Sequence, residues 1–357
     1  MRFSPFNSFK RLSLTVALVF SLAATSGIAT ALFSRTQLTS DSSTVATVPQ
    51  SSDTIVSTTL SPPVNSTSST IPIDSLDFTS RFIDTNNEEA ARLAWKTVNS
   101  RPLHRMNWTG SVQSCRAGKT DNLFKEDILY RVQWFRAMAG VNPKIVLNEE
   151  SNRLAQEAAL VMAAANDLSH TPDSDWPCYS QAAYDGASES NLYLGLFGVP
   201  TVDGYIEDSG DNNYEVGHRR WILDPTLFSI GTGDTRNSNA LFLTNSETDE
   251  KAEIREDNGF VMWPPRGYVP KSQIYDRWSI SHQTADFSRA VVTVSHNGKT
   301  RVFKDPHSDS EGYGSMNSLV FNWPRPAKGS GPIHVTVKNI ELNRLLTTFE
   351  YDVLPFS

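Results

Sequence analysis

The chain has 357 residues, of which 39% are hydrophobic and 10% aromatic, and its formal net charge is −7. This length exceeds that of one ordinary domain, so the composition predicts two folded units with sizeable cores and additional segments. The negative charge and the lack of clustered Lys and Arg argue against nucleic acid as the main partner, because phosphate binding depends on such clusters.

The amino terminus has the features of an export signal. Basic residues precede a run without charge over residues 12–33, and the Ala-Thr-Ala triplet at 29–31 suits cleavage. Residues 1–33 are therefore predicted to be a signal peptide, or a signal anchor, since the run is nearly long enough to span a bilayer. Either way, the rest of the chain is expected outside the cytoplasm, secreted or anchored to a membrane and facing outside.

A segment rich in Ser, Thr and Pro follows over residues 34–82 and contains few aromatic residues. Such a segment buries too little apolar surface to offset the entropy of the chain. We expect a disordered linker that holds the folded part away from a membrane or wall.

Three helices are predicted next. The first begins near Asn86, where the stretch Asn86-Asn87-Glu88-Glu89 offers capping side chains and early acids. The second covers residues 125–139, where apolar residues recur every three or four positions, and it ends at Gly140. The third has Asn148 as its N-cap and runs to about Asn166.

Beyond this helix the sequence favours loops, then short strands near 229–233 and 239–243. Helices followed by strands predict an α+β fold, with a sandwich of helices and a sheet over residues 83–250. Alternating β-formers then recur to the end of the chain, which predicts a small all-β immunoglobulin-like sandwich over residues 255–357. Its strands are expected at 290–294, 300–303, 318–323, 333–337 and 348–353.

The sequence contains two cysteines, Cys115 and Cys178. An oxidising compartment permits a disulfide between them, and this is the pairing that we predict. Two free buried thiols are the alternative.

One stretch, residues 205–223, concentrates acids, a histidine and two arginines and ends in an apolar anchor. This profile suits a polar site at the edge of a core, although a helix start with His218 in its solvated first turn is the other interpretation. Two imidazoles and two carboxylates can bind a divalent transition ion or perform general acid–base work. The side chains in question are His170, Glu189, Asp208 and His218.

Three motifs in this order resemble the CAP superfamily, which holds cysteine-rich secretory proteins, insect venom antigens and plant pathogenesis-related proteins. The resemblance covers about residues 84–245 and rests on Ser169-His170, Glu189-x-Asn191-Leu192 and Gly217-His218-Arg219-Arg220-x-Ile222-Leu223. It implies an α-β-α sandwich with a surface cleft lined by two histidines and two acids. Bacterial members of the superfamily are often joined to a carboxy-terminal β domain.

By this resemblance His170, Glu189 and His218 match the first histidine, the first acid and the second histidine of the cleft. The family places the second acid three residues after an aromatic residue, usually Trp. Here that aromatic residue is Tyr205, which gives Asp208. Glu207 and Glu215 are the alternatives to Asp208.

The resemblance implies an exported module whose cleft binds a lipid, a sterol-like molecule or a ligand on a cell surface or wall. A zinc ion or another divalent cation is expected at His170 and His218, with water completing its shell. The alternatives are a metal-dependent hydrolase, acting on peptides or wall material through His170, Glu189, Asp208 and His218, and a non-catalytic structural or adhesive surface protein. The sequence leaves the oligomeric state open.

Overall fold

The computed structural model describes residues 58–60, 77–245, 253–255, 257–304, 306–309, 313–323 and 331–357. All of them belong to one compact unit, Ile55–Ser357. The predicted signal segment, 1–33, and most of the predicted linker, 34–82, lie outside the described residues. Among the described helices, none is both long and apolar enough to span a membrane.

The three predicted helices are confirmed, and their caps explain their bounds. Helix α1 (Glu88–Ser100) is capped by Asn87, which lies in the predicted capping stretch and whose side chain accepts hydrogen bonds from two backbone amides. Helix α2 (Asn122–Ala139) ends at Gly140, which adopts a left-handed conformation with φ 74°. Helix α3 (Glu149–Ala165) begins at Asn148, which accepts a hydrogen bond from Ser151 N at 2.9 Å.

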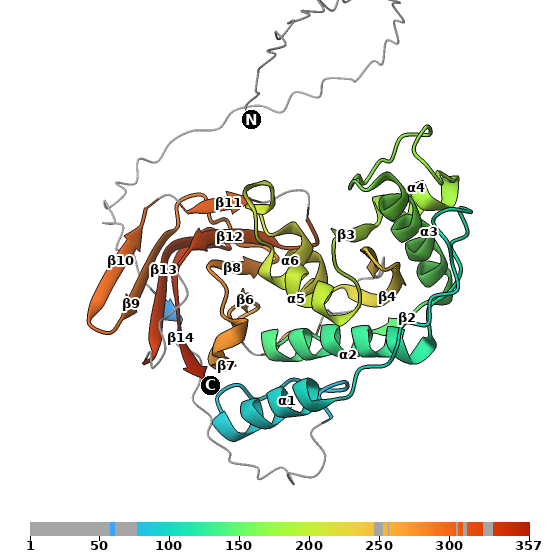
Figure 1. The fold of residues 1–357 in the computed structure, drawn as a ribbon. Helices are drawn as coiled ribbons and strands as arrows, with labels where there is room; N and C mark the ends of the chain where they lie inside the picture. The colour runs from blue at the N-terminus through green and yellow to red at the C-terminus, as the bar shows by residue number, and fades with distance from the viewer. Residues whose placement is uncertain are drawn as a thin grey trace, which may run out of the picture. The chain divides into compact units, whose positions relative to one another are not determined.

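A four-stranded sheet lies between these helices, with the strand order β2-β4-β5-β3 (Figure 1). Strands β4 (Leu227–Asp234) and β5 (Ser238–Asn245) are the predicted pair, slightly extended at both ends. Of the two outer strands, β3 (Ser190–Leu194) falls in the segment expected to be rich in loops, and β2 (Val146–Leu147) lies between the second and third predicted helices, where no strand was predicted.

Helices cover both faces of this sheet, as successive side chains of β5 demonstrate. Leu241 and Leu243 belong to the core that includes α2, whereas Ala240 and Phe242 pack with α3 and α4. This alternation is the period-two pattern of a strand buried on both sides. In β4, a Cβ atom on Gly231 would lie 2.1 Å from the backbone of α3, so glycine permits the close approach of helix and sheet.

The prediction of a loop-rich part between residues 167 and 226 is wrong in several places. Helices form there because small residues let them pack closely, although these elements are too short to give a clear periodic signal. A Cβ atom on Gly186 of α4, for example, would lie 2.1 Å from the carbonyl oxygen of Leu154 in α3. The elements are α4 (Gln181–Ser188), α5 (Val199–Glu207), the 3₁₀ turn η1 (Asp211–Asn213) and α6 (Gly217–Ile222).

The carboxy-terminal region is rich in β-strands, which form two sheets. One has the order β1-β14-β13-β9-β10, with β7 also paired to β14, and the other has the order β11-β12-β8-β6. The five predicted strands are confirmed as β9 (Val291–His296), β10 (Lys299–Phe303), β12 (Asn317–Asn322), β13 (Ile333–Leu342) and β14 (Leu345–Phe356). The remaining elements were not predicted from the sequence. They are β1 (Thr58–Leu60), β6 (Val261–Trp263), β7 (Gly267–Pro270), the turn η2 (Lys271–Gln273), β8 (Arg277–His282) and β11 (His307–Asp309). The immunoglobulin-like arrangement stays a prediction.

Buried side chains run without interruption from α2 into the carboxy-terminal sheets. Trp134 and Phe135 of α2 contact Trp263 of β6, with ring centroids 6.4 and 5.1 Å apart. Phe78 is also buried in this core, with 1% of its surface exposed, so the packed chain begins before residue 83. The domain ranges 83–250 and 255–357 remain predictions.

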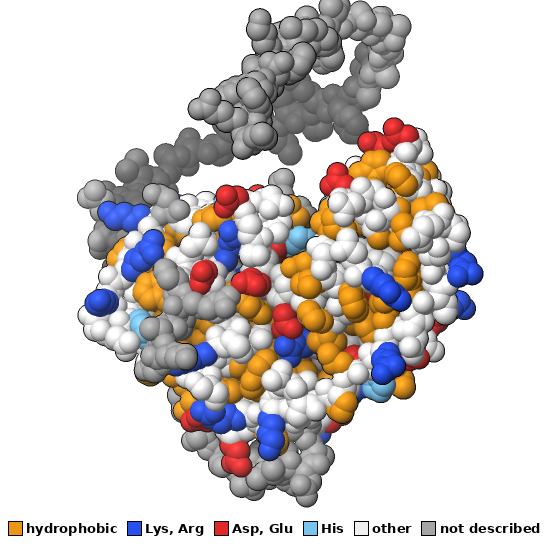
Figure 2. Space-filling model, viewed as in Figure 1, with side chains coloured by type: hydrophobic (Ala, Val, Ile, Leu, Met, Phe, Trp, Pro, Cys, Tyr) orange, Lys and Arg blue, Asp and Glu red, His pale blue; other side chains and the backbone are white. Residues whose placement is uncertain are grey.

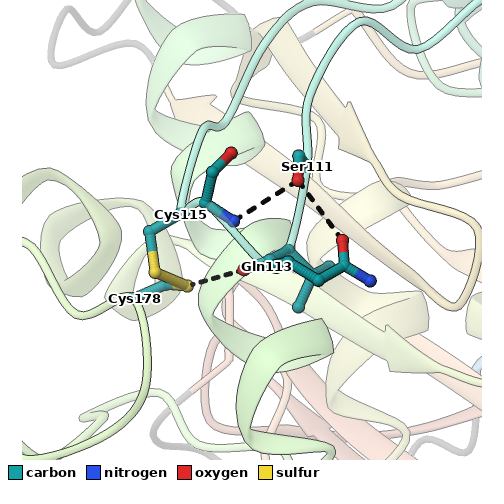
Figure 3. Close-up of a disulfide and its surroundings, with 6 residues drawn as sticks. Ser111, Gln113, Cys115 and Cys178 are labelled. Atoms are coloured by element: carbon teal, nitrogen blue, oxygen red, sulfur yellow. Dashed lines mark hydrogen bonds between the residues drawn. A yellow bond between two sulfur atoms is a disulfide. The ribbon is translucent and has the colours of Figure 1, made fainter.

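The predicted disulfide is confirmed. Cys115 and Cys178 are bonded, with their Cα atoms 5.0 Å apart across a sequence separation of 63 residues (Figure 3). The bridge ties the segment between α1 and α2 to the segment between α3 and α4.

Candidate functional site

The pair formed by His218 and Asp208 lies at the centre of the candidate site. His218 is in the first turn of α6, and its Nδ1 atom lies 2.7 Å from Oδ1 of Asp208. Asp208 caps the carboxyl end of α5 in a left-handed conformation with φ 51°, and only 1% of it is exposed. Its Oδ2 atom accepts a hydrogen bond from the backbone amide of Arg219 at 3.2 Å. Residues 205–223 were interpreted either as a polar site or as a helix start. Both interpretations apply, because the candidate site lies at the start of α6.

His170 lies on the segment between α3 and α4 and is exposed. Its Nδ1 atom lies 2.9 Å from the carbonyl oxygen of Ala187, near the end of α4. In both histidines an oxygen acceptor thus engages Nδ1, which favours the tautomer with a proton on that atom and a lone pair on Nε2.

Two adjoining cavities, of about 310 and 330 Å³, meet at these histidines. His170 and His218 line both cavities, as do the two asparagines of η1, Asn212 and Asn213. Glu189 lines only the first cavity and Asp208 only the second. The structure therefore brings His170, Glu189, Asp208 and His218 together around one cleft.

The three candidates for the second acid occupy different surroundings. Asp208 bonds directly to His218. Glu207 lines neither cavity. Glu215 precedes α6 instead of lying within it. Its carboxylate lines the first cavity and lies 3.6 Å from Nε2 of His307 in β11.

Tyr205, the aromatic residue of α5, is buried next to His218, with ring centroids 5.4 Å apart. Its hydroxyl donates to Oδ1 of Asn239 at 2.8 Å and contacts the carbonyl oxygen of Asn191 at 3.0 Å. Asn191 in turn donates from Nδ2 to the carbonyl oxygen of His218 at 3.1 Å. Burial raises the pKa of the Tyr205 hydroxyl well above its usual value, so this network holds a neutral phenol.

The same network continues to Asp234 at the end of β4. Its carboxylate accepts hydrogen bonds from the Gly198 amide at 2.7 Å, Asn239 Nδ2 at 2.9 Å and Thr232 Oγ1 at 3.0 Å. Complete burial nevertheless raises the pKa of Asp234 to about 6. Asp234 joins the sheet to the start of α5 and so supports the helix that presents Asp208.

Two arginines fix the 206–213 segment to the carboxy-terminal sheet. Arg277 of β8 donates to the carbonyl oxygens of Asp208, Gly210 and Asn213 at 2.8, 3.0 and 2.8 Å. Arg219 donates to the carbonyl oxygen of Ile206 at 2.6 Å and to Ser279 Oγ at 3.1 Å. Burial lowers the pKa of Arg219 to about 10, so it remains a cation at neutral pH. These arginines hold the backbone of residues 206–213 in place, and neither of them lines the cleft.

Two aromatic residues of the first cavity were not predicted from the sequence: Trp221 of α6 and Tyr313 of the carboxy-terminal region. Trp221 belongs to the 205–223 stretch but was interpreted only as an apolar anchor. Tyr313 is 95 positions beyond His218, and no local pattern in the sequence indicates that it contacts this site.

The serines of the first cavity already donate their hydroxyl protons to backbone oxygens. Ser188 Oγ donates to Asp185 O at 3.0 Å, and Ser190 Oγ donates to Gly186 O at 2.6 Å. A serine nucleophile instead needs an adjacent base that accepts its proton. The geometry therefore favours binding, or activation of water, over catalysis by a serine.

The two histidines fit a divalent cation in one respect. Ligating histidines usually donate their second ring nitrogen to a carboxylate or a backbone carbonyl, which are the Nδ1 partners of His218 and His170 here. In the part of the chain that the structure describes, no group of three or more His, Cys, Asp or Glu side chains is arranged to hold a metal. Two imidazoles would therefore need water or a bound molecule to complete the shell.

Comparison with known protein families gives one match, to the cysteine-rich secretory protein family, CAP, over residues 129–245. Neither the curated proteins nor the solved structures gave a match. The matched range contains all four cleft residues and the sheet behind them. The chain thus contains, over residues 129–245, a CAP domain of the cysteine-rich secretory protein family, and a β-rich region follows it.

Proposed function

We propose that this protein is an exported binding module whose CAP cleft holds a divalent cation, such as zinc, between His170 and His218. The arrangement of the two imidazoles carries this proposal. Each Nδ1 atom is engaged by an oxygen, at 2.9 Å in His170 and 2.7 Å in His218, and both side chains line the same two cavities. Nε2 of each ring is then the nitrogen with which an ion can bind.

The negative charge of the carboxylates around the two imidazoles favours the binding of a cation. The buried Asp208 carboxylate contacts one imidazole, and the Glu189 and Glu215 carboxylates line the first cavity. A cation bound to neutral imidazoles would be stabilised by this negative charge. Two protein ligands are fewer than structural zinc sites use, so we expect an open site of micromolar affinity.

Two features support export. The uncharged run at 12–33 matches a signal peptide or anchor, and an oxidising compartment is where disulfides such as Cys115–Cys178 persist. The protein would then be secreted, or anchored through residues 12–33 with the CAP domain outside the cell.

The test is calorimetric titration of zinc into the full chain and into the double variant His170→Ala/His218→Ala. The matched control is His334→Ala, because His334 of β13 also pairs with an aspartate, Asp352, at 2.9 Å but lies outside the cleft. We expect micromolar binding by the parent and the control and none by the double variant, with unchanged circular dichroism. Absence of binding by the parent, or full binding by the double variant, would overturn the proposal.

A metal-dependent hydrolase is the second candidate, and Glu189 favours it. This residue is exposed, lines the cavity that both imidazoles share and forms no hydrogen bond or ion pair through its carboxylate with another described residue. Such a carboxylate can act as a general base toward water bound to a metal. Zinc-dependent cleavage of casein or cell-wall polymer, lost in Glu189→Gln with zinc affinity retained, would establish this activity, and no cleavage by the parent would exclude it for these substrates.

A further inference from the structure

The carboxy-terminal β-rich region supplies part of the wall of the CAP cleft. Tyr313 lines the first cavity together with His218, Glu189 and Trp221. Its ring packs against Gly217, where a Cβ atom would lie only 2.6 Å from two ring carbons. The glycine before His218 thus permits the close approach of this tyrosine.

Two charged residues, one in α6 and one just after it, hold the Tyr313 segment in place. The guanidinium of Arg220 lies 5.3 Å from the ring centroid of Tyr313 and donates to the carbonyl oxygen of Met316 at 3.0 Å. The buried carboxylate of Asp224 accepts hydrogen bonds from the backbone amide of Ser315 and from its hydroxyl, the latter at 2.8 Å. An aromatic surface anchored in this way is formed before a ligand binds.

The lining of this cavity combines aromatic faces with hydrogen-bond acceptors. Trp221 and Tyr313 contribute ring surface, Glu189 and Glu215 contribute carboxylates, and Asn212 contributes an amide. Ionised carboxylates only accept hydrogen bonds, so a ligand here has to donate them. An acyl chain would leave the Glu189 carboxylate without a hydrogen-bond donor, and burial of an unpaired charge is costly.

Saccharides have both required properties. One face of a sugar ring is made of C–H groups that pack on an aromatic ring, and its edge carries hydroxyls that donate to carboxylates and amides. In the cleft without a bound cation, an anionic ligand would be repelled by Glu189 and Glu215. Arg219 would not offset this repulsion, because its guanidinium donates to Ile206 O and Ser279 Oγ and is buried.

We propose that the cleft takes a neutral saccharide and that Tyr313 contacts it and helps to determine specificity. This inference rests on the proposed function of the cleft as a binding site and names the chemical class of its ligand. It also gives the β-rich region a role in binding, since the CAP domain alone lacks this part of the wall.

The test is calorimetric titration of cellotetraose and chitotetraose, both neutral, into the full chain without added zinc, with tetragalacturonate as the anionic comparison, because a bound zinc ion would itself attract an anion. We expect at least one neutral sugar to bind and tetragalacturonate to bind at least tenfold more weakly. Tyr313→Phe keeps the ring and should bind within about twofold of the parent, whereas Tyr313→Leu should bind at least tenfold more weakly. Tyr184→Leu is the matched control, because Tyr184 of α4 is half-buried and does not line either cavity.

Absence of binding by both neutral sugars, tighter binding of tetragalacturonate, or equal binding by Tyr313→Leu and the parent would each overturn the inference. Zinc titration of the same variants separates this inference from the proposed function. Tyr313→Leu should bind zinc as the parent does, since the tyrosine contacts neither imidazole through a hydrogen bond. Loss of sugar binding with retained zinc binding is therefore the expected pattern, and failure of the parent to bind zinc would contradict the metal proposal alone.

Discussion

Nδ1 of His218 lies 2.7 Å from Oδ1 of Asp208, and the Asp208 side chain has no exposed surface. A buried carboxylate at this distance fixes the orientation of the imidazole and the nitrogen that carries the proton. Asp208 reaches His218 because it adopts a left-handed conformation at the end of α5 and lies close to the start of α6. This relationship determines which ring nitrogen can bind an ion.

Asp208→Asn should weaken zinc binding by about tenfold to hundredfold, the usual effect of losing a carboxylate behind a ligating histidine. The amide keeps the size of the side chain and one acceptor oxygen, so the fold should be retained. Calorimetric titration measures the affinity, and Asp352→Asn, behind the exposed His334, is the control. Equal zinc affinity in Asp208→Asn and the parent would show that this carboxylate does not support an ion.

Arg277→Gln should lower the free energy of unfolding by about 2 kcal/mol, because three carbonyl oxygens lose a charged donor. Zinc affinity should fall as well, since one of these oxygens belongs to Asp208. Urea denaturation and zinc titration measure the two effects. Arg289→Gln removes an exposed ion pair with Glu341 and should change stability by less than about 1 kcal/mol. An Arg277→Gln variant as stable as the parent would contradict the positioning role.

Asp234 should make the protein less stable as the pH rises from 4 to 7. Burial raises its pKa from 3.8 to about 6 in the folded protein, so the folded state binds more protons than the unfolded state between these values. This group alone then lowers the free energy of unfolding by about 2 kcal/mol across that range. Urea denaturation at several pH values should show a flatter profile for Asp234→Asn, and parallel profiles would contradict the assignment.

Removal of the disulfide, by Cys115→Ser/Cys178→Ser, should destabilise the protein by about 4 kcal/mol, because the bridge closes a loop of 63 residues in the unfolded chain. Urea denaturation of the parent, with and without reductant, gives an independent estimate. Thiol titration of the unreduced, denatured parent should find no free thiol, and two reactive thiols would contradict the bridge.

Local signals predicted the longer helices well. Asn148 and Gly140 fix helix ends through hydrogen bonds and a left-handed turn within a few residues, so the sequence shows them directly. Helix α5 was not predicted because it has only 9 residues and contains Gly204, a poor helix former, although Pro200 in its first turn is compatible with a helix start. Tertiary packing explains the glycine in this helix, because a Cβ atom on Gly204 would lie 2.5 Å from the ring of Tyr193 in β3.

The candidate site could be predicted only in part. His170, Glu189 and His218 were identified through their resemblance to a family, since their spacing alone is too wide to indicate a site. The resemblance could not include Tyr313 or Arg277, because they lie outside the CAP domain and contact it through the tertiary fold. A pattern within a short window contains no information on such contacts.

The most direct test of the central claim is anomalous diffraction at the zinc edge from crystals of the full chain grown with zinc. We predict one strong peak in the cleft, about 2.0–2.1 Å from Nε2 of both His170 and His218. A peak bound by other residues, or no peak in the cleft at saturating zinc, would contradict the account of these two histidines as the ligands of a divalent cation.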